Sequence, residues 1–440
     1  MKCRPQIILA SVLFALQAPA DHWPQWRGPT ADGVSIETDV LTEWGPDKNL
    51  RWRTPLPEAG NSTPVVWGDY VFLTQPESGT HRRTLISIHR PDGQLRWQEG
   101  VTYGAKEPSH ATNPFCSPSP ATDGERVIAW FGSAGLFCYD MEGKELWRRD
   151  LGLQEHMWGH GTSPILFNDL CILNFGPGKR EMLIAVNKET GEDVWRVDPI
   201  PMAEELAFSS AENNGNAADR ASGDDLANIL RGSWGTPVIA DTGSRKELIV
   251  SHPRRITAYD PTSGSEFWTC GGYAPLAYVS PVISEDTVVV LGGWFGASLA
   301  VKMGGSGDVT GSRKVWHKPR DGSYLGTGVA HDGHLYVASM EGLISCTDIQ
   351  TGEQAWEERL ESSSGRNEVW SSITMSGDTV MYVSNQAGDT FVFRPDPQRY
   401  DQVARNSIDE HTNASVIIGN GDVFVRTHKA LWCFAKQASP

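Results

Sequence analysis

The sequence has little of what marks a helical, membrane-spanning or nucleic-acid-binding protein. Helical periodicity is almost absent from its 440 residues. The apolar run at the N-terminus, residues 7–16, is too short to span a membrane. Basic residues are outnumbered, with 38 Lys and Arg against 54 Asp and Glu, and the net charge is −16. This charge argues against nucleic acid or an anionic membrane as the main partner, and we interpret it as a contribution to solubility.

Short motifs that carry catalysis are also missing. The sequence has no Gly-x-Ser-x-Gly elbow, phosphate-binding loop, Cys-x-x-Cys pair or calcium-binding loop. His156 and His160 stand four residues apart, but glycines and no helical pattern surround them, so we expect no metal site there. A Ser/His/Asp triad can be assembled on paper from any chain of this length and carries no weight. The sequence therefore predicts no catalytic residue.

The N-terminus has the features of a secretory signal. Lys2 and Arg4 precede the apolar run, and residues 18–20, Ala-Pro-Ala, fit a small-x-small cleavage site. We expect residues 1–20 to be removed and the exported chain to be periplasmic or secreted, without a transmembrane segment. The alternative is a frayed N-terminal segment of a cytoplasmic protein.

What the sequence has in abundance is tryptophan, with 17 residues, many of them in one repeated phrase. In "KETGEDVW", residues 188–195, a turn containing Gly191 is followed four residues later by Trp195. Similar phrases end at Trp97, Trp147, Trp268, Trp316 and Trp356. Successive copies are about 40 to 50 residues apart, with one longer interval between Trp195 and Trp268. This period predicts a ring or stack of similar supersecondary units.

Each repeat has the pattern of four short strands. Five copies open with Ser/Thr-Pro, as in "STPVV" from residue 62, and a strand rich in β-branched and aromatic residues follows. The third strand has a small residue at its centre, the Gly turn makes the next hairpin, and the Trp ends the fourth strand. This unit is typical of a β-propeller blade. We expect each indole to cover the neighbouring blade, with the small residue allowing close sheet packing, at about 3 kcal/mol per contact.

The two ends of the chain set the number of blades. Residues 369–403 are a seventh unit in which Val403 stands where Trp is expected, and residues 412–436 are an eighth with three strands. A lone strand carrying Trp52 lies within residues 41–56. We predict an all-β, eight-bladed β-propeller of four-stranded antiparallel blades, in which this N-terminal strand completes the last blade and removes two open edges. Residues 21–440 would then form a single domain, which we expect to be a monomer.

Two features depart from the repeat. Among six cysteines downstream of the signal segment, Cys138, Cys346 and Cys433 occupy the small-residue position, so we expect buried thiols rather than a disulfide framework. Residues 199–232 form a polar insertion between the third and fourth blades. Because it leaves a fourth strand and returns to a first strand, we expect it over the funnel mouth, as a functional loop or as a surface excursion.

Segments that lead into first strands line the centre of a propeller, and here they are rich in aromatic and polar residues. Two interpretations stay open: an aromatic-walled pocket for a flat ligand or a partner's side chains, or a plug that fills the funnel. The candidate funnel residues are His156, Trp158, His160, Arg231, Trp234, Trp370 and His411.

The repeated phrase resembles the pyrroloquinoline-quinone-type (PQQ-like) β-propeller repeat. The best matches are "AVNKETGEDVW" at 185–195, "AYDPTSGSEFW" at 258–268 and "CTDIQTGEQAW" at 346–356, and the resemblance covers roughly residues 50–437. "WPQWRGPTADGVS", residues 23–35, also resembles the mature start of exported propellers of this type in planctomycete-like bacteria.

The resemblance implies one of two functions. One branch comprises quinoprotein dehydrogenases, which hold the quinone and a calcium ion in the funnel; the alcohol-oxidising members have adjacent cysteines, and this sequence has none. The other branch is similar to the scaffold lipoprotein of the outer-membrane β-barrel assembly machinery, whose lipid-attachment cysteine is missing here. We expect a non-catalytic, exported scaffold without a cofactor that binds a protein or carbohydrate partner over its funnel face. The alternative is a PQQ-dependent dehydrogenase or another small-molecule oxidoreductase.

Overall fold

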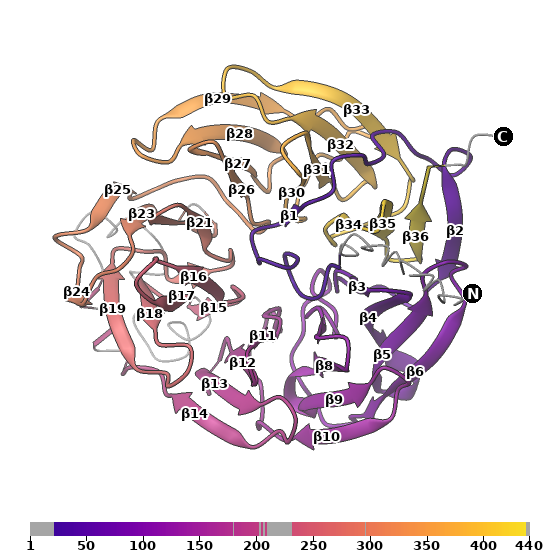
Figure 1. Cartoon of the computed structure of the whole chain (residues 1–440), viewed down its shortest axis with the longest axis horizontal. Coiled ribbons are helices and arrows are strands. Elements are labelled where there is room, and N and C mark those ends of the chain that lie inside the picture. Colours follow the sequence, from indigo (N-terminus) through magenta and orange to yellow (C-terminus); the bar gives the residue numbers. More distant parts are fainter. Residues whose placement is uncertain are drawn as a thin grey trace, which may run out of the picture.

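The described strands form a closed ring of eight sheets around a central axis (Figure 1). The structure is a computed structural model and describes residues 22–436 except 179, 202, 203, 206, 209–230 and 295. In each blade four neighbouring strands pair antiparallel, with the first strand at the axis and the last at the rim (Figure 1). The predicted all-β, eight-bladed propeller is confirmed.

Seven blades consist of four strands that are consecutive or nearly so in the chain. Blades one and two contain β3 (Val65–Trp67), β4 (Tyr70–Glu77), β5 (Arg82–His89), β6 (Leu95–Thr102), β7 (Ala121–Thr122), β8 (Arg126–Trp130), β9 (Leu136–Asp140) and β10 (Glu145–Arg149). Blades three and four contain β11 (Ile165–Phe167), β12 (Leu170–Phe175), β13 (Met182–Asn187), β14 (Asp193–Val197), β16 (Val238–Asp241), β17 (Lys246–His252), β18 (Arg255–Tyr259) and β19 (Glu266–Gly271). Blades five and six contain β21 (Val282–Ser284), β22 (Thr287–Val290), β23 (Ser298–Lys302), β25 (Lys314–Lys318), β26 (Val329–His331), β27 (His334–Ala338), β28 (Leu343–Asp348) and β29 (Gln354–Arg359). Blade seven contains β30 (Thr374–Ser376), β31 (Val380–Ser384), β32 (Asp389–Arg394) and β33 (Asp401–Ser407).

The eighth blade is built from both ends of the chain. Its inner strands are β34 (Ile417–Gly419), β35 (Asp422–Arg426) and β36 (Ala430–Phe434), and its outer strand is β2 (Leu50–Pro55). β2 pairs antiparallel with β36 and places Trp52 opposite Cys433. In Figure 1 the indigo β2 lies beside the yellow β36. The N-terminal strand β2 is therefore the outer neighbour of the C-terminal strand β36 in this blade.

Several short elements decorate the ring. β24 (Gly307–Asp308) pairs parallel with β19, and β1 (Val34–Ser35) pairs parallel with β30. β15 (Gly232–Ser233) and β20 (Leu276–Ala277) form a separate two-stranded parallel sheet. Residues 199–232 separate β14 from β16, as expected, but most of this insertion lies outside the described residues, as do residues 1–20. Among the described residues, no helix is long and apolar enough to cross a membrane.

The small residue of the repeat lies directly opposite the tryptophan of its own blade. Ala185 on β13 faces Trp195 on β14, and Cys346 on β28 faces Trp356 on β29. The same register pairs Ser87, Cys138, Ala258, Ala300 and Cys433 with Trp97, Trp147, Trp268, Trp316 and Trp52. A β-bulge follows each pair in the register. Because a large residue here would stand against the indole, the small residue leaves the ring free to reach the next blade.

The turn glycine of the repeat receives the tryptophan of the preceding blade. Gly191 of blade three has φ of +73°, and a Cβ there would lie 2.7 Å from Trp147 of blade two. The Trp147 Nε1–H donates to the Lys188 carbonyl of the same turn at 3.0 Å. Equivalent bonds of 2.6 to 3.1 Å join Trp52, Trp97, Trp195, Trp316 and Trp356 to carbonyls of Arg90, Met141, Pro261, Ile349 and Asp396. The glycine of one phrase and the tryptophan of the preceding phrase therefore form one contact between neighbouring blades.

Blade five has a different joint. The β23–β25 connection is longer, and its segment β24 lies against Trp268, pairing with it at Gly307. Trp268 is fully buried, and its Nε1–H donates to Glu247 of its own blade at 2.8 Å. The longer spacing in "TGSRKVW" thus marks the joint where the repeating contact is replaced.

Gly191→Ala should destabilise the propeller by about 2–4 kcal/mol. The left-handed φ costs an alanine about 1 kcal/mol, and the added methyl overpacks the Trp147 indole for a further 1–3 kcal/mol. Gly421→Ala is the matched control, because Gly421 has φ of +76° and nothing within 4 Å of its Cβ position. Denaturant unfolding of Gly421→Ala measures the cost of the left-handed φ alone. The additional loss in Gly191→Ala measures the cost of overpacking the Trp147 indole. Equal losses would show that the indole does not pack as described.

The cysteines fill core positions. The six cysteines among the described residues are all free and buried. Burial raises the pKa of the Cys138 thiol to about 12 and raises that of Cys433 as well. The expectation of buried thiols in the small-residue position is confirmed for Cys138, Cys346 and Cys433.

An N-terminal strap, residues 22–35, crosses the ring on one side. In Figure 1 this indigo segment runs across the centre of the ring. Trp23 exchanges two backbone hydrogen bonds with Val66 of blade one, and β1 at the other end pairs with β30 of blade seven. Between them, Thr122 N–H donates to the Pro24 carbonyl, and Leu166 N–H donates to Gln25 Oε1. The strap therefore connects blades one, two, three and seven without being part of a repeat.

Arg27 fixes the far end of the strap. Its guanidinium is buried and donates to the Asp32 carbonyl at 2.7 Å. It also donates to the carbonyls of Gly328 in blade six and Ile373 in blade seven. Burial lowers the pKa of Arg27 to about 10, with nearby Asp32 acting in the opposite direction. A single side chain thus ties the strap to blade six and adds a second contact with blade seven.

Candidate functional site

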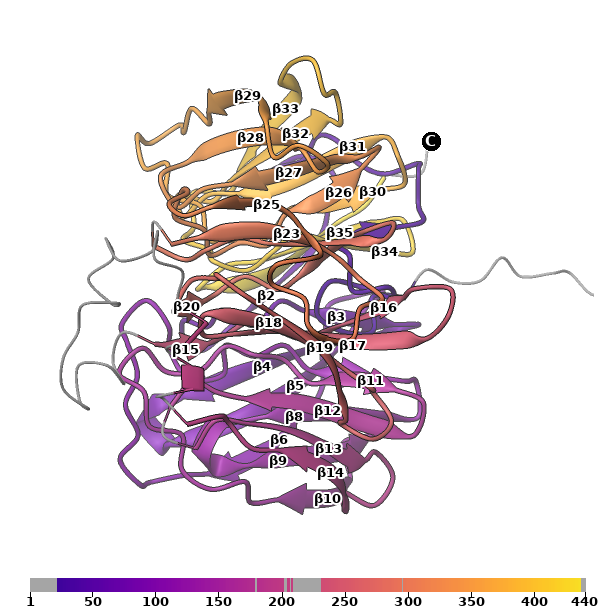
Figure 2. The ribbon, with the colours of Figure 1, turned by 90° about the vertical axis from the view of Figure 1, so that its left-hand side faces the viewer.

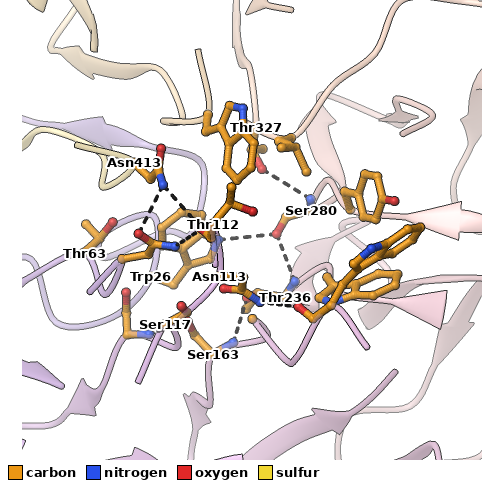
Figure 3. A pocket seen from close by; sticks show the side chains of 18 of the residues that line it. Trp26, Thr63, Thr112, Asn113, Ser117, Ser163, Thr236, Ser280, Thr327 and Asn413 are labelled. Atoms are coloured by element: carbon orange, nitrogen blue, oxygen red, sulfur yellow. Dashed lines mark hydrogen bonds between the residues drawn. The ribbon is translucent and has the colours of Figure 1, made fainter. Parts of the chain in front are cut away.

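A cavity of about 420 Å³ occupies the centre of the ring (Figure 3). It is built from the segments that enter the first strands of all eight blades, together with three loops and Trp26 of the strap. Its lining comprises Trp26, Asn61, Thr63, His110, Thr112, Asn113, Ser117, Ser119, Trp158, Gly161, Ser163, Trp234, Thr236, Tyr278, Ser280, Trp294, Leu325, Thr327, Met340, Trp370 and Asn413. As far as the described residues show, the funnel therefore contains a pocket and not a plug of side chains.

Around this cavity runs a chain of hydrogen bonds with one Ser or Thr from each blade. The backbone N–H of each member donates to the hydroxyl of the next at 2.9 to 3.3 Å. The order is Ser119, Ser163, Thr236, Ser280, Thr327, Ser372, Ser415 and Thr63. Figure 3 shows the part from Ser163 to Thr327. The Ser/Thr of the Ser/Thr-Pro signal thus links neighbouring blades at the axis.

The hydroxyl ring has one interruption, between blades one and two. Ser119 begins the chain, and its own Oγ is buried without a hydrogen-bond partner. Ser119 also lines the cavity. The ring is therefore open at the point where the β6–β7 loop supplies Thr112, Asn113 and Ser117 to the same lining.

The strap closes the cavity on one side of this ring. Val66 and Leu166, which contact the strap, each lie three residues after a ring member, Thr63 or Ser163. Trp26 itself lines the cavity, and its Nε1–H lies 3.4 Å from Ser280 Oγ. The cavity is thus covered by the strap on the side toward which the first strands run.

On the opposite side, four aromatic residues form a continuous wall. Trp158 lies against Trp234 and Trp294, with ring centroids 6.0 and 5.8 Å apart. Tyr278 packs on Trp234 at 5.0 Å and faces Trp158 at 6.4 Å. The indole Nε1–H of Trp234 donates to the Gly159 carbonyl at 3.0 Å, which fixes that ring. We call Trp158, Trp234, Tyr278 and Trp294 the aromatic wall.

Trp294 is the most exposed member of this wall. Its relative exposure is 56%, whereas Trp158, Trp234 and Tyr278 are half-buried. Its backbone has φ of +48°, a left-handed conformation that is unfavourable for a bulky residue. Backbone strain together with exposure of an indole is a combination found at functional sites.

The cavity contains three of the seven residues predicted from the sequence, Trp158, Trp234 and Trp370. His156 is buried behind the wall, with its ring 4.8 Å from Trp234 and its Nδ1 accepting from the Trp158 N–H. His411 packs against His428, with ring centroids 4.3 Å apart. Neither histidine belongs to the lining.

Arg231 lies in a separate cluster at the base of the insertion. Its guanidinium pairs with Glu205 at 2.6 Å and with Glu181 at 3.2 Å. Glu205 also pairs with Arg254 at 2.7 Å, so the two described ends of the insertion are joined to blade four. Glu205 is almost fully buried. This ion-pair network lies outside the central cavity.

His160 is buried beside the cavity lining rather than in it. Its ring lies 4.7 Å from that of Trp130, and its Nδ1 is 3.5 Å from Glu107 Oε1. Glu107 accepts from Arg83 at 2.8 Å, and burial raises its pKa. Burial, with a smaller contribution from Arg83, lowers the pKa of His160 to about 3. Among the described residues, no group of three or more His, Cys, Asp or Glu side chains could hold a metal ion.

The buried His160 should make the fold less stable in acid. Its pKa is lower in the folded protein than in the unfolded chain, so between about pH 6.5 and pH 3 the unfolded chain binds one more proton. The contribution of His160 to the free energy of unfolding is therefore fully present above pH 6.5. Below that pH it decreases by up to about 1.4 kcal/mol per pH unit. Urea unfolding of His160→Gln between pH 6.5 and 5 should show a slope that is shallower by this amount. His81→Gln, at an exposed position, controls for loss of a histidine, and parallel slopes for the wild type and His160→Gln would contradict the assignment.

Sequence reasoning did not identify Tyr278, Trp294 and Trp26. Tyr278 stands two residues before the ring member Ser280, as Trp234 stands before Thr236, so repeat alignment could have found it. Trp294 comes from the β22–β23 loop and Trp26 from the strap. Neither position recurs in the repeat, so no sequence signal pointed to the funnel.

Among the residues that the structure describes, the lining contains no Asp, Glu, Lys or Arg. Pyrroloquinoline quinone is a tricarboxylate, and calcium requires several oxygen ligands, among them carboxylates. A buried anion without neighbouring cations is strongly disfavoured. The described residues of this cavity therefore do not fit the quinone with its calcium ion.

The family model described as outer membrane protein assembly factor BamB matches residues 32–168, 179–300 and 305–395. The chain belongs to this family. Membership agrees with the PQQ-like repeats recognised in the sequence, whereas the planctomycete-type resemblance of residues 23–35 stays a prediction. None of the curated proteins compared with the chain matches it.

Solved structures from this family and from quinone enzymes share the fold. BamB from Moraxella catarrhalis is 14% identical, with a TM-score of 0.58, over 88% of this chain and 99% of that chain. A europium-containing methanol dehydrogenase is 10% identical, with a TM-score of 0.69, over 96% of this chain and 99% of that chain. Quinohemoprotein alcohol dehydrogenase from Comamonas testosteroni is 12% identical, with a TM-score of 0.67, over 97% of this chain and 82% of that chain. At these identities the likeness concerns the fold alone, so function has to be argued from the site.

Proposed function

We propose that this BamB-family propeller is an exported, non-catalytic binding protein that holds a protein or carbohydrate partner at its funnel face. The observation that carries the proposal is the uncharged lining of the central cavity. General acids, bases and quinone-binding cations all require ionisable side chains at the reacting group. In the described lining, the ionisable residues His110 and Tyr278 have no Asp, Glu, Lys or Arg beside them, and the buried pair of Glu107 and His160 lies outside the lining.

Binding is favoured by the shape and composition of the same cavity. A volume of about 420 Å³ lies within the range of ligand pockets, which are mostly apolar with a few placed polar groups. The aromatic wall supplies the apolar surface, and the amide and hydroxyl side chains supply the polar groups. Export is inferred from residues 1–20, and a family of assembly factors is consistent with a partner-binding role.

The proposal is tested by comparing quinone binding with partner capture. The full chain, exported with its own N-terminus, would be incubated with pyrroloquinoline quinone and calcium, desalted, and assayed for a retained chromophore and for dye-linked alcohol oxidation. We expect no retained chromophore and no turnover. In parallel, the protein should capture a specific partner from the envelope fraction, and Trp294→Ala should reduce this capture. A stoichiometric chromophore with turnover would establish the dehydrogenase alternative instead.

A further inference from the structure

The rings of the aromatic wall are tilted by 41° to 70° to one another, so the wall is a faceted apolar surface on which single indole faces can stack. Its neighbouring ring centroids lie 5.0 to 6.4 Å apart, so adjacent rings are in contact with one another. A cage for a quaternary ammonium group needs rings that leave space for the cation between them. The wall therefore suits a ligand that lies against it with one face.

The cavity offers no counter-charge to such a ligand. None of its described lining residues is Asp, Glu, Lys or Arg, and His110 is the one histidine among them. A charged ligand would lose its hydration without gaining a partner of opposite charge. The ligand should therefore be neutral, and salt should have little effect on its binding.

The side of the cavity formed by blades eight, one and two is polar. Asn61 donates to the Thr112 carbonyl at 3.0 Å, and Asn413 lies 3.3 Å from Asn61, so the amides are held in place (Figure 3). Ser119 offers a buried hydroxyl that has no partner within the protein. A buried hydroxyl without a hydrogen bond is costly, and a ligand hydroxyl in the cavity would supply the missing bond.

We propose that the funnel binds a neutral oligosaccharide, with the face of a sugar ring against the aromatic wall and sugar hydroxyls directed at Ser119 and the asparagines. Sugars combine an apolar C–H face with many hydroxyls and, when unmodified, carry no charge. The C–H face of a sugar matches the aromatic wall, and its hydroxyls match the amide and hydroxyl side chains of the cavity. The absence of charge on the sugar matches the uncharged described lining. This inference rests on the proposed binding function and specifies its ligand class. The exposed, strained Trp294 is the stacking residue nearest to solvent.

The test is an array of hexasaccharides of neutral glucans, xylans, mannans and galactans, with a galacturonate hexamer as the anionic counterpart. We expect a neutral hexasaccharide to bind and to quench tryptophan fluorescence, with an affinity that changes less than twofold between 50 and 500 mM NaCl. Trp294→Ala should weaken binding at least tenfold, and Ser119→Ala should weaken it about fivefold without lowering stability.

Two variants provide matched controls. Leu95→Ala removes a side chain that is 55% exposed on β6, close to the exposure of Trp294 but on the rim of the ring. Ser87→Ala removes another buried hydroxyl without a partner, on β5 opposite Trp97 and outside the cavity. Both should bind the hexasaccharide like the wild type.

The other outcomes contradict either the oligosaccharide inference or the proposed binding function. If no neutral hexasaccharide binds, or only the galacturonate hexamer binds, the oligosaccharide inference is wrong. Binding that Trp294→Ala and Ser119→Ala leave unchanged would place the ligand elsewhere and would also refute it. Capture of a protein partner without glycan binding would preserve the proposed function and remove only this inference. Quinone binding with turnover would remove the proposed function itself.

Discussion

A chain that begins at residue 57 should not reach a stable folded state. It lacks β2, which covers β36 and supplies Trp52, and it lacks the adjacent Leu56; both side chains are only 8% exposed. Loss of these two side chains alone removes about 5 kcal/mol or more, comparable with the whole stability of many proteins. The edge of β36 and the core residue Cys433 would also become exposed. We expect no cooperative thermal transition for this truncation.

Two further chains isolate the contribution of β2. A chain beginning at residue 41 lacks the strap but keeps β2, and it should melt cooperatively. A circular permutant that begins at residue 57 and carries residues 41–56 after residue 436 should melt like it, because Leu50 already lies opposite Phe434. Calorimetry of the three proteins compares them directly. Identical melting of the chains beginning at 57 and 41 would mean that β2 does not hold the eighth blade.

Arg27→Ala should destabilise the propeller far more than removal of a surface arginine. The buried guanidinium donates to carbonyls of Asp32, Gly328 and Ile373, and its removal leaves these acceptors without their partner. Unpaired buried carbonyls cost about 1–3 kcal/mol each. Burial of the charge is itself costly, as the lowered pKa of Arg27 shows, and the substitution recovers that cost. We expect a net loss of about 3 kcal/mol.

Denaturant unfolding of Arg27→Ala and Arg148→Ala compares the loss of unfolding free energy when a buried arginine and a surface arginine are truncated. Arg148 pairs with Glu145 on the surface, with 62% of its side chain exposed, so its removal should cost less than about 0.5 kcal/mol. Because the strap covers the cavity beside Trp26, Arg27→Ala should also weaken ligand binding at the funnel. A stability loss no larger than that of Arg148→Ala would show that the strap is not a structural tie.

Much of the architecture was predictable because it repeats. Eight copies of one short pattern average out local ambiguity, and the Gly turn, small residue and Trp each recur at fixed spacing. Trp147 and Gly191 show why: each contributes to a contact that the next blade makes again with equivalent residues. The partner of each Trp was still not predictable in detail. Six of the indole Nε1–H groups bond to a carbonyl of the next blade, whereas that of Trp268 bonds to Glu247 in its own blade.

The candidate site was predictable only in part. Trp158 and Trp234 were found because they precede first strands, a position that the repeat marks. His156 and His160 carried the same signal but lie behind the lining, because the chain turns at residues 157–158 and the Gly159 N–H donates to the His156 carbonyl at 2.8 Å, so the alternation of an extended strand does not hold here. Arg231 was drawn away by its ion pairs with Glu205 and Glu181.

By itself, the sequence determined the blade, the number of blades and the meeting of the two chain ends, because these follow from local patterns and from the need to cover sheet edges. Only the tertiary structure decided the function-bearing features: the strap that covers one side of the funnel, the break in the hydroxyl ring at Ser119, and the aromatic wall with Trp294. These depend on contacts between residues up to several hundred positions apart, and a contact of that kind leaves no periodic trace in a single chain.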